Sequence, residues 1–420
     1  MLTQQDISVN EALSIVLDSV TVLQPEDVPL QESLGRILAE SIVARESLPP
    51  FANSSMDGFA LRASDVVRAS VENPVKLRVV GESAAGNPAD TAVGEDEAVR
   101  ITTGAPMPPG ANAVIPVEDT GHARHEVLGT VPSEITIRRS LQPGDYVRMP
   151  GEDVRDGSTV LEAGVLVRPQ EIGLMASLGY ASVKVIRKPR VGVLATGDEL
   201  VEIDEALSPG KIRNSNGYVQ AAQVVEAGAA PVLLGVARDS LTDLRARLQQ
   251  GIASSVDMFV SSAGVSVGAY DVVTHILRNE GRVQFWRVRM RPGKPLTFGD
   301  YAGAHYFGLP GNPVSAVVSF ERFVRPALLK MGGHTQLDRP LIEVSIDREL
   351  HSDGRESYLR AVVRKVEGNY VATPTGRQGS HMMTSLASAN ALVIVPENTR
   401  HVAEGSHLMA MMLDWPASVF

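Results

Sequence analysis

The chain has no cysteine, and its other shortages also narrow its function. Without cysteine it cannot form disulfides, iron–sulfur clusters, Cys-ligated zinc sites or a thiolate nucleophile. Its 39 Lys and Arg are outnumbered by 49 Asp and Glu, and the net charge of −10 argues against duplex nucleic acid as the main partner. It has no apolar run of about 18 residues, as a membrane-spanning helix requires. No Lys or Arg precedes Arg36, whereas a secretory signal starts with basic residues. These absences predict a cytoplasmic protein without a membrane partner.

The composition is otherwise typical of folded protein. Hydrophobic residues make up 44% of the 420 residues and charged residues 21%, which is too apolar for a disordered chain. At roughly 100–200 residues per domain, this length corresponds to two to four domains. Ser8 and Glu11 have the spacing of a capping box, which predicts an amphipathic helix through Val20.

The pattern of turn, strand and helix signals changes along the chain and suggests four domains. Residues 48–153 carry many turn signals between short β-branched runs, which predicts a small β lobe. The flanking segments 1–47 and 154–187 are mixed, and we expect them to form one linking domain. In residues 188–330 strand-like runs alternate with helical segments, which predicts a doubly wound, mostly parallel α/β domain. Residues 331–420 show strand patterns, which predicts a compact C-terminal β-barrel or sandwich.

Five apolar runs of the α/β part are expected to be buried strands. They are residues 191–196, 231–237, 257–262, 283–288 and 305–309. Ligands of an open parallel sheet bind beyond the carboxyl ends of its strands. The loops that follow these strands should therefore meet at one edge and form a site. These loops are residues 196–199, 238–240, 262–271, 291–295 and 309–313.

Glycines and charged residues dominate these loops. Gly264, Ser266 and Gly268 precede a predicted helix, where backbone N–H groups can cradle a phosphate, although a plain tight turn has the same composition. The loop lacks both the Gly-Lys-Ser/Thr ending of a Walker A loop and the dinucleotide-binding glycine spacing. Arg291 and Lys294 offer cations for an oxyanion.

Acidic residues in the same loops offer oxygen ligands for a hard divalent ion such as Mg²⁺. They are Asp198, Glu199, Asp239 and Asp271. Each alone fits a solvated loop residue or a helix cap, and Asp271 at a predicted helix start is the clearest case. Their convergence on one edge favours a site. The residues by themselves predict nucleotide- or phosphate-linked transfer at an α/β site.

Over nearly its whole length the sequence resembles the molybdopterin molybdenumtransferase family (MoeA, whose animal counterpart is the gephyrin E domain). Any single block is weakly specific, but their joint order is highly specific. The blocks are 49–58, 103–106, 151–153, 196–200, 264–268, 291–295, 309–315, 378–380 and 388–390.

The resemblance implies an enzyme that inserts molybdate into adenylated molybdopterin, with Mg²⁺-dependent cleavage of the adenylate and release of AMP. It implies a MogA-like α/β domain, a small β lobe, a linking domain that serves dimerisation and a C-terminal β-barrel. It also implies a homodimer in which the β lobe of one subunit approaches the α/β domain of the other. The expected partners are an upstream molybdopterin adenylyltransferase and downstream molybdoenzymes or their chaperones.

The resemblance also assigns roles to residues. The expected catalytic residues are Asp57, Asp153, Glu199, Asp239 and Asp271, and Asp239 and Asp271 are also the expected metal ligands. The expected substrate-binding residues are Thr103, Gly264, Ser266, Gly268, Arg291, Lys294, Pro310, Pro313, Arg360 and Ser380. Within this set, Arg291, Lys294, Arg360 and Ser380 match the positions that face molybdate.

The chain departs from the usual family pattern at a few positions. Ala52, Ala263 and Ala269 stand where an Asp, a Gly and a polar or acidic residue are common, and Asn214 replaces a frequent Asp. A non-catalytic family member that acts as a scaffold is therefore the alternative. A nicotinamide-dependent dehydrogenase would also suit the strand–helix alternation, but the glycine fingerprint is missing.

Overall fold

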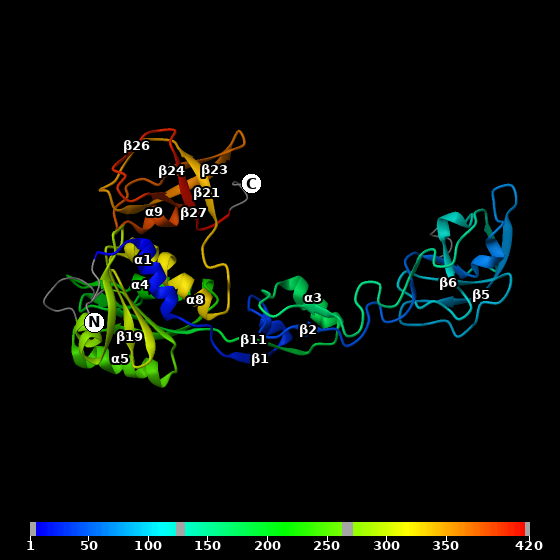
Figure 1. The fold of residues 1–420 in the computed structure, drawn as a ribbon, viewed down its shortest axis with the longest axis horizontal. Coiled ribbons are helices and arrows are strands. Elements are labelled where there is room, and N and C mark those ends of the chain that lie inside the picture. The colour runs from blue at the N-terminus through cyan, green and yellow to red at the C-terminus, as the bar shows by residue number, and fades with distance from the viewer. Residues whose placement is uncertain (1–5, 123–130, 263–271, 416–420) are drawn as a thin grey trace. The chain divides into compact units, whose positions relative to one another are not determined.

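The computed structural model describes residues 6–122, 131–262 and 272–415, and Figure 1 shows its elements. The chain divides into two compact units. The first comprises residues 1–28, 35–39 and 184–420, and the second comprises residues 29–34 and 40–183. The four-part division predicted from the sequence is finer than this two-way division and stays a prediction. No helix among the described residues is both long and apolar enough to cross a membrane.

The first unit begins with helix α1 (Val9–Ser19), which starts as the sequence predicted. The Ser8 side chain accepts a hydrogen bond from the Glu11 backbone N–H at 3.2 Å, and the Glu11 carboxylate accepts one from the Ser8 N–H at 2.8 Å. This capping box satisfies N–H groups that have no partner inside the helix. The apolar face of α1, including Ala12 and Val16, is buried in the main core of the unit.

A six-stranded sheet with the order β15-β12-β16-β20-β19-β17 forms the centre of the first unit. Its strands are β12 (Arg190–Thr196), β15 (Ala230–Ala237), β16 (Met258–Ser262), β17 (Gly281–Arg287), β19 (Pro295–Tyr301) and β20 (Ala304–Leu309). β12 is parallel to β15 and β16, and β16 is parallel to β20, as predicted. Strand β19, which pairs antiparallel with both β20 and β17, was not predicted from the sequence.

The presence of β19 does not change the sheet edge at which the loops were predicted to meet. Two successive antiparallel pairings return β17 to the direction of β20, so the loop after β17 emerges at the same edge as the loops after the parallel strands. The hairpin between β19 and β20 turns at Ala302 and Gly303, both with positive φ, at the opposite edge. The loop that carries Arg291 and Lys294 therefore lies at the sheet edge predicted from the sequence.

Helices cover both faces of this sheet, as a doubly wound fold requires. They are α4 (Ser215–Glu226), α5 (Leu241–Ala253), α6 (Val272–Glu280), α7 (Pro313–Ser319), the π-helix η4 (Phe320–Val324) and α8 (Arg325–Met331). Residues of α5 and α6 share a core with one face, whereas α1, α4, α7, η4 and α8 pack against the other (Figure 1).

The C-terminal part of the first unit is a closed five-stranded barrel. Its strands are β21 (Leu341–Ile346), β23 (Glu356–Val366), β24 (Asn369–Pro374), β25 (Ala391–Val395) and β27 (His407–Met412). The barrel closes because β25 pairs with both β27 and β23. Strand β18 (Met290–Arg291) leaves the α/β domain and pairs in parallel with the start of β23. The unit also contains α9 (Met383–Ala387), β22 (Leu350–His351), β26 (His401–Val402), β13 (Leu200–Val201) and β14 (Ile212–Arg213).

The second unit contains a β lobe with a five-stranded sheet in the order β7-β4-β6-β5-β8. These strands are β4 (Gly58–Leu61), β5 (Val75–Ser83), β6 (Glu97–Ile101), β7 (Ala113–Pro116) and β8 (Glu134–Ile137). Helix α3 (Pro169–Ser177) ends just before Gly179. The remaining elements among the described residues are β1 (Pro25–Pro29), η1 (Leu30–Ser33), β2 (Ile42–Val43), β3 (Asn53–Ser54), η2 (Ala63–Val66), η3 (Val117–Asp119), β9 (Val147–Arg148), β10 (Thr159–Leu161) and β11 (Ser182–Ile186).

Candidate functional site

A cavity of about 520 Å³ lies in the first unit, where the carboxyl edge of the α/β sheet meets the barrel. Residues of both parts line it. They are Arg291, Pro292, Gly293, Lys294, Pro295 and Ser315 from the α/β part, and Arg348, Glu349, Leu350, His351, Arg355, Ser357, Tyr358, Leu359, Arg360, Pro374, Gly376, Gln378, Gly379 and Ser380 from the barrel. The structure thus brings Arg291, Lys294, Arg360 and Ser380 together at one cavity.

The loop that carries Arg291 is fixed by backbone pairing and by close packing. In the ladder between β18 and β23, Met290 lies opposite Glu356 and Arg291 opposite Ser357. Gly293 has φ +118°, and a Cβ at this position would lie 2.7 Å from the Ser319 hydroxyl oxygen. Only glycine fits such a backbone without strain. The packing therefore holds both cations of the loop, Arg291 and Lys294, at the cavity.

Positive charge dominates the cavity wall. Five of the lining residues are Lys or Arg: Arg291, Lys294, Arg348, Arg355 and Arg360. Glu349 is the single acidic residue among those that line the cavity. Field lines focus in a recess where one charge sign predominates, so the cavity favours anions.

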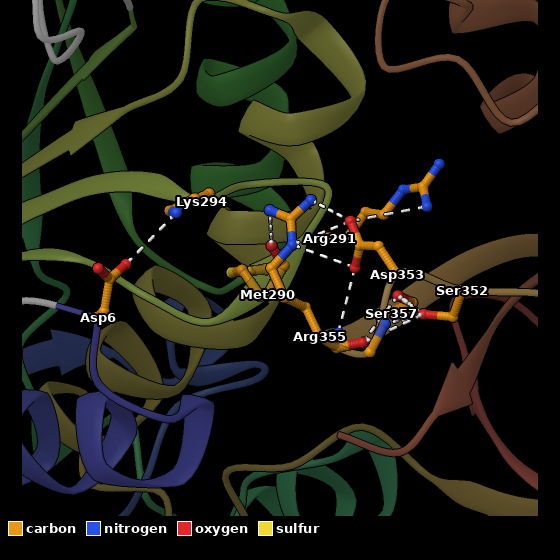
Figure 2. Close-up of polar contacts among 9 residues, drawn as sticks. Asp6, Met290, Arg291, Lys294, Ser352, Asp353, Arg355 and Ser357 are labelled. Carbon is orange, nitrogen blue, oxygen red and sulfur yellow. Dashed lines mark hydrogen bonds and ion pairs between the residues drawn. The ribbon is translucent and has the colours of Figure 1, made fainter. Parts of the chain in front are cut away.

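Two carboxylates next to the cavity pair with its cations (Figure 2). Asp353 lies 3.8 Å from Arg291 and accepts hydrogen bonds of 3.1 and 3.2 Å from the Nε of Arg355. The hydrogen bonds from Arg355 lower the pKa of the Asp353 carboxyl to about 2, so it is ionised at neutral pH. On the other side, the Asp6 carboxylate lies 3.6 Å from the Lys294 ammonium.

Arg360 differs from the other cations because it is only 1% exposed. Its guanidinium donates to the Ser385 hydroxyl at 3.1 Å from both Nε and Nη2. It also donates to the carbonyls of Gln378 at 3.2 Å and Gly379 at 3.0 Å. These acceptors are neutral, and burial lowers the pKa of Arg360. A buried cation held by neutral groups attracts an anionic ligand.

Ser380 links the barrel to the start of helix α7. Its carbonyl accepts a hydrogen bond from the Val314 backbone N–H at 3.1 Å. Pro310 is buried after β20, and Pro313 occupies the first turn of α7, where proline needs no N–H partner. The predicted loop 309–313 is therefore next to the Ser380 side of the cavity.

The loops after β12 and β15 meet at the same sheet edge. The Asp198 N–H donates to the Asp239 carboxylate, and the Asp239 N–H donates to the Asp198 carboxylate, both at 3.3 Å. Glu199 packs over Gly197, where a Cβ would lie 2.4 Å from a Glu199 carboxylate oxygen. Asp198, Glu199 and Asp239 are exposed. No group of three or more His, Asp or Glu among the described residues is placed to hold a metal ion without a further ligand.

Part of the predicted phosphate cradle cannot be placed. Gly264, Ser266, Gly268 and Asp271 lie outside the described residues, so the structure leaves these predictions as they stand. Strand β16 before them and helix α6 after them are described, and β16 ends at the sheet edge used by the other loops.

The second unit contains the remaining predicted residues. The Asp57 carboxylate accepts hydrogen bonds from the Thr103 N–H at 2.8 Å and from the Thr103 hydroxyl at 2.9 Å. The structure thus brings Asp57 and Thr103 together on the β lobe. Asp153 is exposed, with its N–H bonded to the Leu48 carbonyl, and its membership of the site stays a prediction.

Several residues of the cavity were missed in the sequence analysis. Arg348 and Arg355 add two cations, Asp353 orients Arg355, and Ser385 holds Arg360. Their sequence neighbourhood shows only alternating strand patterns and turn residues. Only the closure of the barrel, which places β23 beside β18, brings them to the α/β edge.

The fold and the cavity together define a protein with a cation-lined cavity where a doubly wound sheet meets a β-barrel. Three family models match the chain: "MoeA N-terminal region (domain I and II)" over residues 7–179, "Probable molybdopterin binding domain" over residues 192–330, and "MoeA C-terminal region (domain IV)" over residues 343–411.

Relatives and a solved structure match along the whole chain. The molybdopterin molybdenumtransferase of Bacillus subtilis is 39% identical, over 98% of this chain and 97% of the relative. Molybdopterin molybdenumtransferase 2 of Mycobacterium tuberculosis is also 39% identical, over 96% of this chain and 98% of the relative. The crystal structure of the molybdopterin biosynthesis MoeA protein from Pyrococcus horikoshii covers 98% of this chain and 100% of its own, with 31% identity and a TM-score of 0.80. The chain belongs to the MoeA family of molybdopterin molybdenumtransferases, which confirms the resemblance found in the sequence.

Proposed function

We propose that this protein is an enzyme of molybdenum cofactor biosynthesis that inserts molybdate into adenylated molybdopterin and releases AMP. One observation carries the proposal. In a chain of this family, the structure lines a single cavity with Arg291, Lys294, the buried Arg360 and Ser380. The non-catalytic alternative has no observation in its favour.

The chemistry of the cavity suits molybdate. Molybdate is a tetrahedral dianion, and guanidinium, ammonium and hydroxyl groups bind such ions through charge-assisted hydrogen bonds. A carboxylate would repel it. Asp353 is already engaged by Arg355, so it orients this cation and leaves the side facing the cavity to the anion. The cavity, at about 520 Å³, also has room for part of a second substrate beside a small oxyanion.

The adenylated pterin would bind along the sheet edge next to this cavity. In this proposal the backbone N–H groups of Gly264, Ser266 and Gly268 bind phosphate oxygens, and Pro310 and Pro313 shape the neighbouring wall. Glu199 would orient the leaving nucleotide or a water molecule. Asp57, Thr103 and Asp153 would reach this edge from the β lobe of a second subunit, so the proposed active form is a homodimer.

Mg²⁺ is the proposed metal. The residues present fit it, because the carboxylates of Asp198 and Asp239 lie on neighbouring exposed loops, where each accepts a backbone N–H from the other residue. Mg²⁺ needs only one or two carboxylates when substrate phosphates supply the other oxygens. Asp239 and Asp271 would hold it. When bound, it would neutralise charge that develops on the phosphate oxygens.

We place the protein in the cytoplasm. Its substrate would come from a molybdopterin adenylyltransferase, and its product would pass to molybdoenzymes or their chaperones. These partners follow from the chemistry of the proposed reaction, since an adenylated pterin must be made before molybdate can replace the nucleotide.

The test is the reaction itself. Purified protein is incubated with adenylated molybdopterin, molybdate and Mg²⁺, and AMP and molybdenum cofactor are measured together. We expect AMP release that depends on molybdate. Lys294→Met should lower kcat/KM about tenfold or more. Lys365 is an exposed lysine of the barrel, and Lys365→Met should leave the rate unchanged. AMP release no higher than in a protein-free control would contradict the proposal.

A further inference from the structure

Most N–H groups of the Arg360 guanidinium donate to acceptors within the protein. An arginine has five N–H groups. Nε donates to Ser385, and Nη1 donates to the Gln378 carbonyl. Nη2 donates to Ser385, to the Gly379 carbonyl and, at 3.4 Å, to the Arg377 carbonyl. These bonds engage Nε, one N–H of Nη1 and both N–H groups of Nη2, so one N–H of Nη1 is left for a ligand in the cavity. The planar guanidinium of Arg360 therefore holds the loop before Ser380, and its charge and one N–H remain for a ligand in the cavity that Arg360 lines.

Ser385 is the residue on which this orientation depends. Its hydroxyl oxygen accepts two bonds from the guanidinium, and its own O–H donates to the Met382 carbonyl at 2.7 Å. The Ser385 carbonyl accepts from the Thr375 hydroxyl at 2.6 Å. Ser385 is 7% exposed and belongs to α9, and its contacts to Met382 and Thr375 hold it within the barrel.

The loop that ends at Ser380 is fixed from the other side by Gln378. The Gln378 side chain accepts a hydrogen bond from the backbone N–H of Arg360 and donates one to the backbone carbonyl of Arg360, both at 3.0 Å. The backbone and the side chain of Arg360 thus both bind the segment before Ser380. A change in the direction of the guanidinium would move the Gln378 and Gly379 carbonyls and, with them, Ser380.

We propose that Ser385 is a positioning residue of the oxyanion site: it directs the Arg360 guanidinium so that one N–H and the uncompensated charge face the cavity and Ser380 stands beside them. The proposal rests on the proposed function for the identity of the anion. Ser385 itself does not line the cavity, so it acts through Arg360.

The test compares Ser385→Ala with Ser385→Thr and with Ser388→Ala. Threonine keeps the hydroxyl, and Ser388 is exposed at the end of the same short helix, where its hydroxyl donates to the Thr384 carbonyl. For Ser385→Ala we expect the Kd and the KM for molybdate to rise about tenfold, with kcat within about twofold, because a bond to a charged group is lost. Ser385→Thr and Ser388→Ala should bind molybdate within about twofold of the unaltered protein.

Molybdate affinity is measured by titration calorimetry as well as by AMP release, because the two readouts separate the two proposals. If the unaltered protein releases no AMP, the proposed function fails, whereas the comparison of molybdate Kd values still tests Ser385. Should Ser385→Ala not fold, Ser385→Cys replaces it, since a thiol fills the space but is a weak acceptor. Wild-type molybdate Kd and KM in the alanine or cysteine variant would overturn the inference, and so would a threonine variant as weak as the alanine variant.

Discussion

Arg339 connects the α/β domain to the barrel, and its removal should weaken the first unit markedly. It lies between α8 and β21 and donates to Glu321 at 2.7 Å, to Glu226 at 2.8 Å and to the Leu413 carbonyl at 2.9 Å. The side chain of Glu321 is 4% exposed and that of Arg339 is 12% exposed. Arg339→Met would therefore leave a buried carboxylate that keeps a hydrogen bond from Gln223 at 2.9 Å and the attraction of the Arg325 charge.

The expected cost follows from this burial. Removing one partner of a buried ion pair costs about 3–5 kcal/mol, because the other charge stays buried without compensation. The Gln223 amide still donates to Glu321, so we expect the lower end, about 3 kcal/mol. For a unit of this size, about 2–4 °C of Tm per kcal/mol gives a fall of roughly 6–12 °C. Arg339→Met combined with Glu321→Gln should recover part of this loss, because no buried charge is then unpaired.

Tryptophan fluorescence during urea unfolding is a suitable assay, because both tryptophans of the chain, Trp286 and Trp415, belong to the first unit. The exposed Arg364 of the barrel supplies the matched control, Arg364→Met, for which we expect a change below about 0.5 kcal/mol. The reasoning is refuted if Arg339→Met costs less than about 1 kcal/mol, or if the double variant is no more stable than Arg339→Met alone.

Three further predictions concern the cavity and the β lobe. Asp6→Asn should tighten molybdate binding about 1.5- to 5-fold at low salt, because it removes a half-exposed carboxylate that competes with molybdate for Lys294. The control Asp18→Asn makes the same charge change and should leave the molybdate Kd unchanged. An unchanged molybdate Kd in Asp6→Asn would contradict the pairing of Asp6 with Lys294. The pKa of Asp353 is lowered to about 2, so its pairing with Arg355 stabilises the fold fully above pH 4 and is lost as the pH falls toward 2. As the pH falls from 4 to 2, the urea midpoint of the unaltered protein should accordingly approach that of Asp353→Asn. A difference between the two midpoints that stays constant over this pH range would contradict the prediction. Thr103→Val should lower kcat about tenfold with the molybdate KM unchanged, because it removes a hydroxyl bond to Asp57 only, and a raised molybdate KM would count against this division of roles.

The parts of the fold that depend on local patterns could be predicted from the sequence. The Ser8 capping box, the parallel strands and the edge at which their loops meet follow from hydrophobic periodicity and end signals, and the structure confirms them. Strand β19 was missed because it begins at Pro295, directly after the glycine and lysine of the loop, and reads as its continuation. Its antiparallel pairing is decided by the β19–β20 hairpin, not by any pattern within the strand.

The candidate site divides in the same way. Arg291 and Lys294 could be expected at the sheet edge because they follow a strand, and Arg360 and Ser380 were expected from family resemblance alone. Arg355 and Ser385 gave no signal, because their roles depend on contacts that exist only once the barrel has closed and β18 has paired with β23. A single sequence does not reveal which strands will meet.

Crystals soaked with molybdate and measured at the molybdenum absorption edge would test the central claim most directly. Molybdenum scatters anomalously, so its position is found independently of any assumption about the reaction. We expect one strong peak in the cavity between Arg291, Lys294, Arg360 and Ser380. A fully occupied peak elsewhere, for example beside Asp198 and Asp239 or on the β lobe at Asp57, with the cavity empty of molybdenum, would contradict it.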